Sequence, residues 1–235
     1  MSPFFQVALH PTPSVSQRDT SLRYTDILFG FVIKELFVRI QYWMQPQHWN
    51  TAVGLQLFVG TVLVLGSWIG YRRSLNRSAW EVKFFNLPLF RFILDQMMLI
   101  LYFRIAVLAP DQGKELAMTA DQLANGTIML VVFIFCLYVC WDLLGIWMAV
   151  AKCDGMYRYR MVGDDNKPTN DQQDRDWNGF YISLVCLALA AFLWSTCGNP
   201  NCLLLGIAAM LLVYRWAKET KTGLKRTAEA QCPPA

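Results

Sequence analysis

Seven of the charged side chains inside the long apolar stretches of this sequence are the residues best placed to do chemistry. They are Asp26, Lys34, Glu35, Arg39, Asp95, Arg104 and Asp142. A charged side chain at the centre of a bilayer costs about 2.5–3.5 kcal/mol on insertion scales, so each needs a partner, water or a function. Such groups mark ion pathways, proton relays or polar contacts between helices.

The spacing of these residues predicts an intramembrane polar network. Glu35 and Arg39 are one helical turn apart and can pair with each other. Arg104 lies at a depth where it can also reach Glu35. A second pairing is expected nearer the cytoplasm: Lys34 with Asp95 or Asp142. Such a network lines a pore or cavity, or it only locks helix packing, and the sequence leaves both interpretations open.

Six apolar stretches must position these side chains. They are Asp26–Trp43, Ala52–Tyr71, Pro88–Ala109, Gly126–Lys152, Phe180–Cys197 and Cys202–Trp216. Each is close to the roughly 20 residues that a helix needs to cross about 30 Å of hydrocarbon. The chain is 55% hydrophobic and only 16% charged, which is typical of membrane proteins. The sequence therefore predicts an all-α, polytopic membrane bundle of six transmembrane helices.

Basic residues alternate between the connecting segments. Arg72, Arg73 and Arg77 follow the second stretch, whereas the turn before the last stretch carries no charge. By the positive-inside rule, six spans with both termini in the cytoplasm fit this alternation. Five spans result if the first stretch lies in the interface instead. The expected parts are an N-terminal tail (1–24), a transmembrane domain in the cell membrane (25–216) and a basic tail (217–235).

Enzyme chemistry has little support in the sequence. The only histidines, His10 and His48, lie outside the stretches, so we expect no metal site, no cofactor and no enzymatic activity. One alternative is an enzyme acting on lipid, in which Asp95 and Asp142 share a proton. Cys197 and Cys202 flank the last turn, where a disulfide is sterically possible in an oxidising compartment. We expect no nucleic-acid partner.

The segment 153–176 is long for a connection between helices. It mixes acidic and basic residues without an apolar period, which is typical of a solvated linker. Docking of a cytosolic protein partner at 153–176 is the alternative interpretation.

Several residues resemble those of the six-span lysosomal-type potassium channels and their prokaryotic relatives. Tyr24-Thr25-Asp26 stands where that family has a Phe-Ser-Asp signature, and Ile27-Leu28-Phe29-Gly30-Phe31 follows it. Ser67-Trp68 with Tyr71-Arg72-Arg73 resembles the end of the family's second span, and a short turn containing proline joins the last two spans. The family's arginine before the signature is replaced by Thr20.

The resemblance implies that the first span lines a pore made by several subunits, with Asp26 near its inner mouth. A ring of Lys34 side chains in such a pore would favour anions over cations. We therefore expect a homo-oligomeric ion channel or permeability pathway in the lipid bilayer, lined by the charged first span. The alternative is a non-catalytic membrane anchor or sensor that docks a cytosolic partner.

Overall fold

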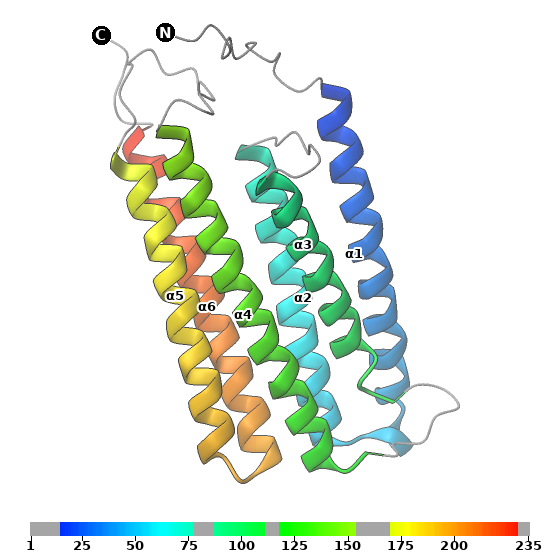
Figure 1. The fold of residues 1–235 in the computed structure, drawn as a ribbon. Helices are drawn as coiled ribbons and strands as arrows, with labels where there is room; N and C mark the ends of the chain where they lie inside the picture. Colours follow the sequence, from blue (N-terminus) through cyan, green and yellow to red (C-terminus); the bar gives the residue numbers. More distant parts are fainter. Residues whose placement is uncertain (1–14, 78–86, 111–117, 154–169, 230–235) are drawn as a thin grey trace, which may run out of the picture.

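The computed structural model is a bundle of six long helices that run alternately up and down (Figure 1). It describes residues 15–77, 87–110, 118–153 and 170–229. The helices are α1 (Val15–Trp43), α2 (Thr51–Arg77), α3 (Leu87–Ala106), α4 (Ala120–Cys153), α5 (Asn170–Thr196) and α6 (Pro200–Glu229), with a short 3-10 turn, η1 (Pro46–His48), after α1. No strand occurs in these ranges, so the predicted all-α fold is confirmed for them.

Side-chain caps define where three of the helices begin. The Asn50 carboxamide oxygen accepts the backbone N–H of Ala52, 2.9 Å away, at the start of α2. Asn199 caps α6 in the same way, with Pro200 as the first helical residue. Thr119 and Gln122 bond reciprocally at the start of α4, as in a capping box. All three caps lie at the end of the bundle opposite the start of α1 (Figure 1).

Four helices contain segments that are long and apolar enough to cross a membrane. These segments are Thr51–Arg72, Ala120–Ile146, Trp177–Thr196 and Pro200–Lys218. α1 and α3 are not among them, because several charged residues interrupt their apolar stretches. Length and composition thus mark four membrane-span candidates within the described residues, in α2, α4, α5 and α6.

α1 lies at one edge of the bundle, against α2 and α3, and runs beside α2 for most of its length (Figure 1). Near one end the Trp68 indole N–H of α2 donates to the Asp26 carboxylate, 2.8 Å away. Near the other end the Trp43 indole N–H donates to the carbonyl of Asn50, 2.9 Å away. The part of α1 between Asp26 and Trp43 therefore lies at the same level as the span candidate of α2.

The core lies where α2, α4 and α6 meet, with α5 packed on α4 and α6 at the edge opposite α1. Its largest apolar side chains are fully buried, and they include Leu63, Phe135, Leu204 and Leu211. Burial of a leucine or phenylalanine side chain is worth about 1.5–3 kcal/mol in water, but lipid supplies no such gain, so close packing must hold these helices together.

Three helices extend furthest beyond the predicted apolar stretches. α1 begins at Val15, α5 at Asn170, and α6 continues to Glu229. Residues 170–176 and 217–229, expected in a linker and a tail, are therefore helical. Hydropathy marks only the apolar part of a helix, whereas backbone hydrogen bonding continues through polar turns until proline interferes. Pro13 and Pro168 precede the two early starts. Residues 1–14, 154–169 and 230–235 of the expected tails and docking loop lie outside the described ranges.

Candidate functional site

Three of the four charged side chains of α1 between Asp26 and Trp43 are neutralised within the bundle. The Asp26 carboxylate accepts from Trp68 and also from the Arg72 guanidinium, whose Nη2 is 2.9 Å from Oδ2. Glu35 and Arg39 form the expected pair one turn apart, with Nη2 2.7 Å from Oε1. Arg39 is buried, so this pair fixes one face of α1 against its neighbours.

Lys34 lies on the outer, exposed face of α1. In the part of the chain that the structure describes, it forms no ion pair and no hydrogen bond. The predicted pairing of Lys34 with Asp95 or Asp142 is absent there, because both carboxylates belong to α3 and α4 and face other partners. Lys34 is thus the unneutralised charge of this part of α1.

Asp95 of α3 faces α4. Its Oδ1 accepts from the Trp141 indole N–H, 3.0 Å away, and the Arg91 guanidinium lies 3.9 Å from the centre of the same indole. Asp142 follows Trp141 but points elsewhere: its Oδ2 accepts from the Ser183 hydroxyl at 2.6 Å and from the Lys218 ammonium at 3.4 Å. The two carboxylates therefore have separate partners and do not form the paired acids of the enzyme alternative.

Asp142 belongs to a larger buried cluster. A chain of hydroxyls runs from Tyr102 of α3 to Tyr138 of α4, 2.7 Å apart, and on to Ser67 of α2, 2.6 Å further. Arg215 of α6 donates to both Ser67, at 2.5 Å, and Tyr138, at 3.1 Å. We call the set the hydroxyl–cation cluster: Ser67, Tyr102, Tyr138, Asp142, Ser183, Tyr214, Arg215 and Lys218.

Two glycines of α2 make room for the Arg215 guanidinium. A Cβ on Gly66 would lie 2.5 Å from Arg215 Nε, and one on Gly70 would lie 3.3 Å from Nη1. This Gly-x-x-x-Gly spacing is common by chance, and its use here is to admit a cation between α2 and α6. Arg215 also lies 5.4 Å from the Tyr214 ring centre and 5.9 Å from that of Tyr138.

The hydroxyl–cation cluster joins five helices and fills the bundle interior. Phe135 packs edge-on against Tyr214, with 5.0 Å between the ring centres, and Tyr138 stacks on Tyr214, with 5.7 Å between the ring centres. The cluster contains one carboxylate, Asp142, and two cations, Arg215 and Lys218. Arg215 Nε is buried without a hydrogen-bond partner, but the bonds made by the other polar atoms of the cluster link the helices and hold them in register.

Sequence reasoning found Asp142 but missed the rest of the cluster. Composition groups Arg215 and Lys218 with the basic tail, because both lie where the last apolar stretch ends and several more basic residues follow. A helical signal was available: the buried positions Ile207, Leu211 and Tyr214 of α6 continue with the same spacing to Lys218. A charged residue on a continuing buried face is a sign of an internal pair.

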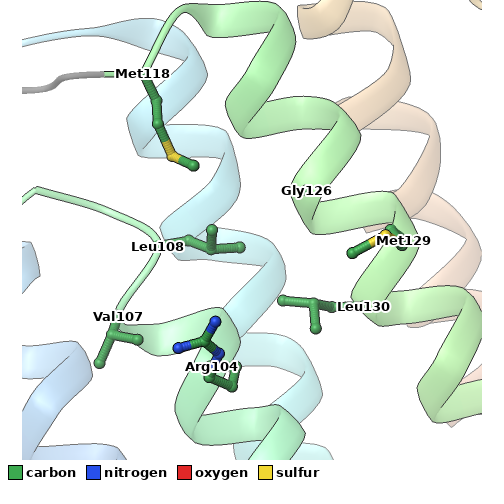
Figure 2. Close-up of a pocket in the computed structure, with 7 residues that line it drawn as sticks. All are labelled: Arg104, Val107, Leu108, Met118, Gly126, Met129 and Leu130. Carbon is green, nitrogen blue, oxygen red and sulfur yellow. The ribbon is translucent and has the colours of Figure 1, made fainter.

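Arg104 is exposed at the end of α3, and its predicted contact with Glu35 is not observed among the described residues. It lies instead in a half-open pocket of about 380 Å³ between the end of α3 and the start of α4 (Figure 2). The other lining residues are Val107, Leu108, Met118, Gly126, Met129 and Leu130. A lone guanidinium thus faces apolar walls.

In the described ranges, no group of three or more His, Cys, Asp or Glu side chains could hold a metal ion. Cys197 and Cys202 are free thiols in the structure. Comparison of the chain with protein-family models, with curated proteins and with solved structures found no match.

Proposed function

We propose that this protein is a homo-oligomeric channel of the cell membrane, in which the outer faces of several α1 helices line a pathway that favours anions. The observation that carries the proposal is Lys34, the outward-facing charge of α1. The other three charged residues of α1 between Asp26 and Trp43 have partners in the same protomer, and Lys34 has none among the described residues.

Lys34 has apolar neighbours on the same exposed face. Ile27, Phe31 and Phe37 are 58%, 60% and 59% exposed, and Val38 is also exposed. These side chains are compatible with lipid, but an ammonium group is not. Contact with a second copy and with water removes the cost of about 2.5–3.5 kcal/mol that lipid exposure would impose.

The position of Lys34 along the helix makes escape to the membrane surface difficult. It is about 12 Å from Asp26 and about 13 Å from Trp43, at 1.5 Å per residue. A lysine side chain reaches roughly half that distance when it snorkels toward the interface. Because this part of α1 runs beside the span candidate of α2, Lys34 is expected at mid-membrane depth.

The packing of the protomer supports a pathway between copies. Aromatic rings and the hydroxyl–cation cluster occupy the interior between α2, α4 and α6. α1 is at the edge of the bundle, where several copies can meet around an axis (Figure 1). A ring of lysines attracts anions and repels cations. The resemblance of the first span to the pore-lining span of lysosomal-type potassium channels agrees with the location of the pathway but not with its ion.

Ion flux into liposomes tests the proposal. Purified protein should pass chloride in preference to potassium, Lys34→Leu should reduce the chloride flux at least about tenfold, and Lys34→Glu should shift the preference toward cations. Gly145→Ala on α4 is the matched control, because no atom lies within 4 Å of its added Cβ and α4 does not contact α1. Equal flux for all four proteins, or no flux from the wild type, would overturn the proposal.

Thiol accessibility tests the location of the pathway. Lys34→Cys, in a background without native cysteines, should react quickly with a charged methanethiosulfonate reagent, because water fills the pathway. Val185→Cys is the control, since Val185 is 57% exposed near the middle of α5 on the opposite edge of the bundle. It should react slowly, as a side chain in lipid does. Equally slow reaction at both positions would contradict a water-filled pathway along α1.

A further inference from the structure

The pocket between α3 and α4 has the shape and polarity of a site for an amphiphile. Its walls are made by Leu108, Met118, Met129 and Leu130, and Arg104 is the one charged residue that lines it (Figure 2). Gly126 keeps the space open, since an added Cβ there would lie 3.6 Å from a Leu108 methyl group, in ordinary contact. A larger side chain would extend into the pocket.

The backbone next to Arg104 lies inside the bundle, away from its end. The carbonyl of the next residue, Ile105, accepts a hydrogen bond from the Gln56 side chain, 2.7 Å away. Gln56 is about 8 Å along the helix axis from the first residue of α2, so Ile105 lies at about that depth. On the other wall, Leu130 is about 15 Å from the start of α4. The pocket therefore extends from the headgroup level into the depth of the acyl chains, if α2 and α4 cross the membrane as their composition indicates.

Arg104 lacks a carboxylate partner in the described residues, in contrast to Arg39 and Arg72. A guanidinium binds phosphate with charge-assisted, often bidentate hydrogen bonds. At this depth the available source of phosphate is a membrane phospholipid, and the adjoining apolar walls suit its acyl chain. Free inorganic phosphate would gain nothing from those walls.

We propose that this pocket binds one phospholipid with a net negative headgroup. Its phosphate pairs with Arg104, and one acyl chain lies against Leu108, Met129 and Leu130. An anionic headgroup is preferred because the choline of a zwitterionic lipid competes with Arg104 for the phosphate. This site is independent of the α1 pathway, and its test measures lipid binding without any ion flux.

Native mass spectrometry of the detergent-purified protein, titrated with phosphatidylglycerol or phosphatidylcholine, tests the site. We expect one tightly bound phosphatidylglycerol, weakened about tenfold or more by Arg104→Gln and largely retained by Arg104→Lys. Arg72→Gln is the control, because that guanidinium is exposed at the opposite end of the bundle. Equal affinity of wild type and Arg104→Gln for phosphatidylglycerol would overturn the proposal.

Two further measurements distinguish binding that uses the acyl-chain contacts from binding by charge attraction alone. Gly126→Leu should fill the pocket and remove binding of both lipids, whereas Gly126→Ala should bind normally, and thermal unfolding verifies that each is folded. Inorganic phosphate at equal concentration should not displace the lipid. Displacement by phosphate, or full binding by a folded Gly126→Leu, would show surface charge attraction in place of a lipid site.

Discussion

The Arg215 guanidinium of α6 donates a hydrogen bond to the Ser67 hydroxyl of α2 across 2.5 Å. This contact joins residues far apart in the sequence and depends on glycine at position 66, where no side chain competes for the space. It links the half of the bundle that contains α1 to the half that contains α5, through one cation and one hydroxyl.

A methyl group at position 66 should therefore destabilise the bundle. In Gly66→Ala the new Cβ would be 2.5 Å from Arg215 Nε, so the guanidinium must move and lose its bonds to Ser67 and Tyr138. We expect a loss of about 1–3 kcal/mol, as for other overpacked sites. Thermal unfolding in detergent measures it. Gly145→Ala, with no atom within 4 Å of its Cβ, is the control and should be neutral or slightly stabilising.

The Asp142–Lys218 pair should respond unequally to removal of its two members. Asp142 is buried and Lys218 is 27% exposed, so a lysine without its partner can reach water but the carboxylate cannot. We expect Lys218→Met to cost about 2–3 kcal/mol and Asp142→Asn about 1 kcal/mol. The double variant should lose less free energy of unfolding than the sum of the losses of the two single variants. Unfolding measurements on all three variants test this, and strict additivity would contradict a direct interaction.

Membrane insertion of α1 should depend strongly on Lys34. Replacing a mid-helix lysine by leucine improves the apparent insertion free energy by about 3 kcal/mol. An insertion assay on the Asp26–Trp43 segment with Lys34→Leu should show this gain, because α1 would then carry only the Glu35–Arg39 pair near its middle. Lys34→Arg serves as the control and should insert as poorly as the wild-type segment. Efficient insertion of the wild-type segment would remove the energetic reason for assembly around Lys34.

Thiol labelling can establish the orientation of the bundle. Cys202 is exposed in the first turn of α6, at the end of the bundle that the positive-inside rule assigns to the outside. A membrane-impermeant maleimide added to intact, reduced cells should label Cys202 in a Cys197→Ser background and lose its signal when Cys202→Ser is added. Cys136 and Cys140, exposed in the middle of α4, should stay unlabelled because lipid surrounds them. Labelling of Cys202 only after lysis would reverse the orientation.

Hydropathy was sufficient to predict the helices, because an apolar run of bilayer length has few structural alternatives. The sequence also predicted the Glu35–Arg39 pair, since both residues lie on one helix with a known spacing. The helix ends were predicted less well: α5 and α6 contain polar turns that resemble loops in composition.

Contacts between helices could not be predicted from depth alone. Lys34, Asp95 and Asp142 lie at compatible depths, yet depth says nothing about the direction in which each side chain points. The rotation of each helix about its axis is set by packing across the bundle. Asp95 is therefore bonded to Trp141, and Asp142 to Ser183 and Lys218. The role of Arg215 could be recognised only once its neighbours on the other helices were known.

The length of α6 has a mechanical consequence. The helix continues without a break from the buried Tyr214 to Glu229. Its C-terminal part therefore extends beyond the last residue of the membrane-span candidate, Lys218. Arg215 of the same helix bonds to Ser67 of α2 and Tyr138 of α4, so a tilt of α6 that moves Arg215 is expected to disturb its contacts with both helices. Movement of the C-terminal part of α6 is therefore expected to change how α6 packs against α2 and α4.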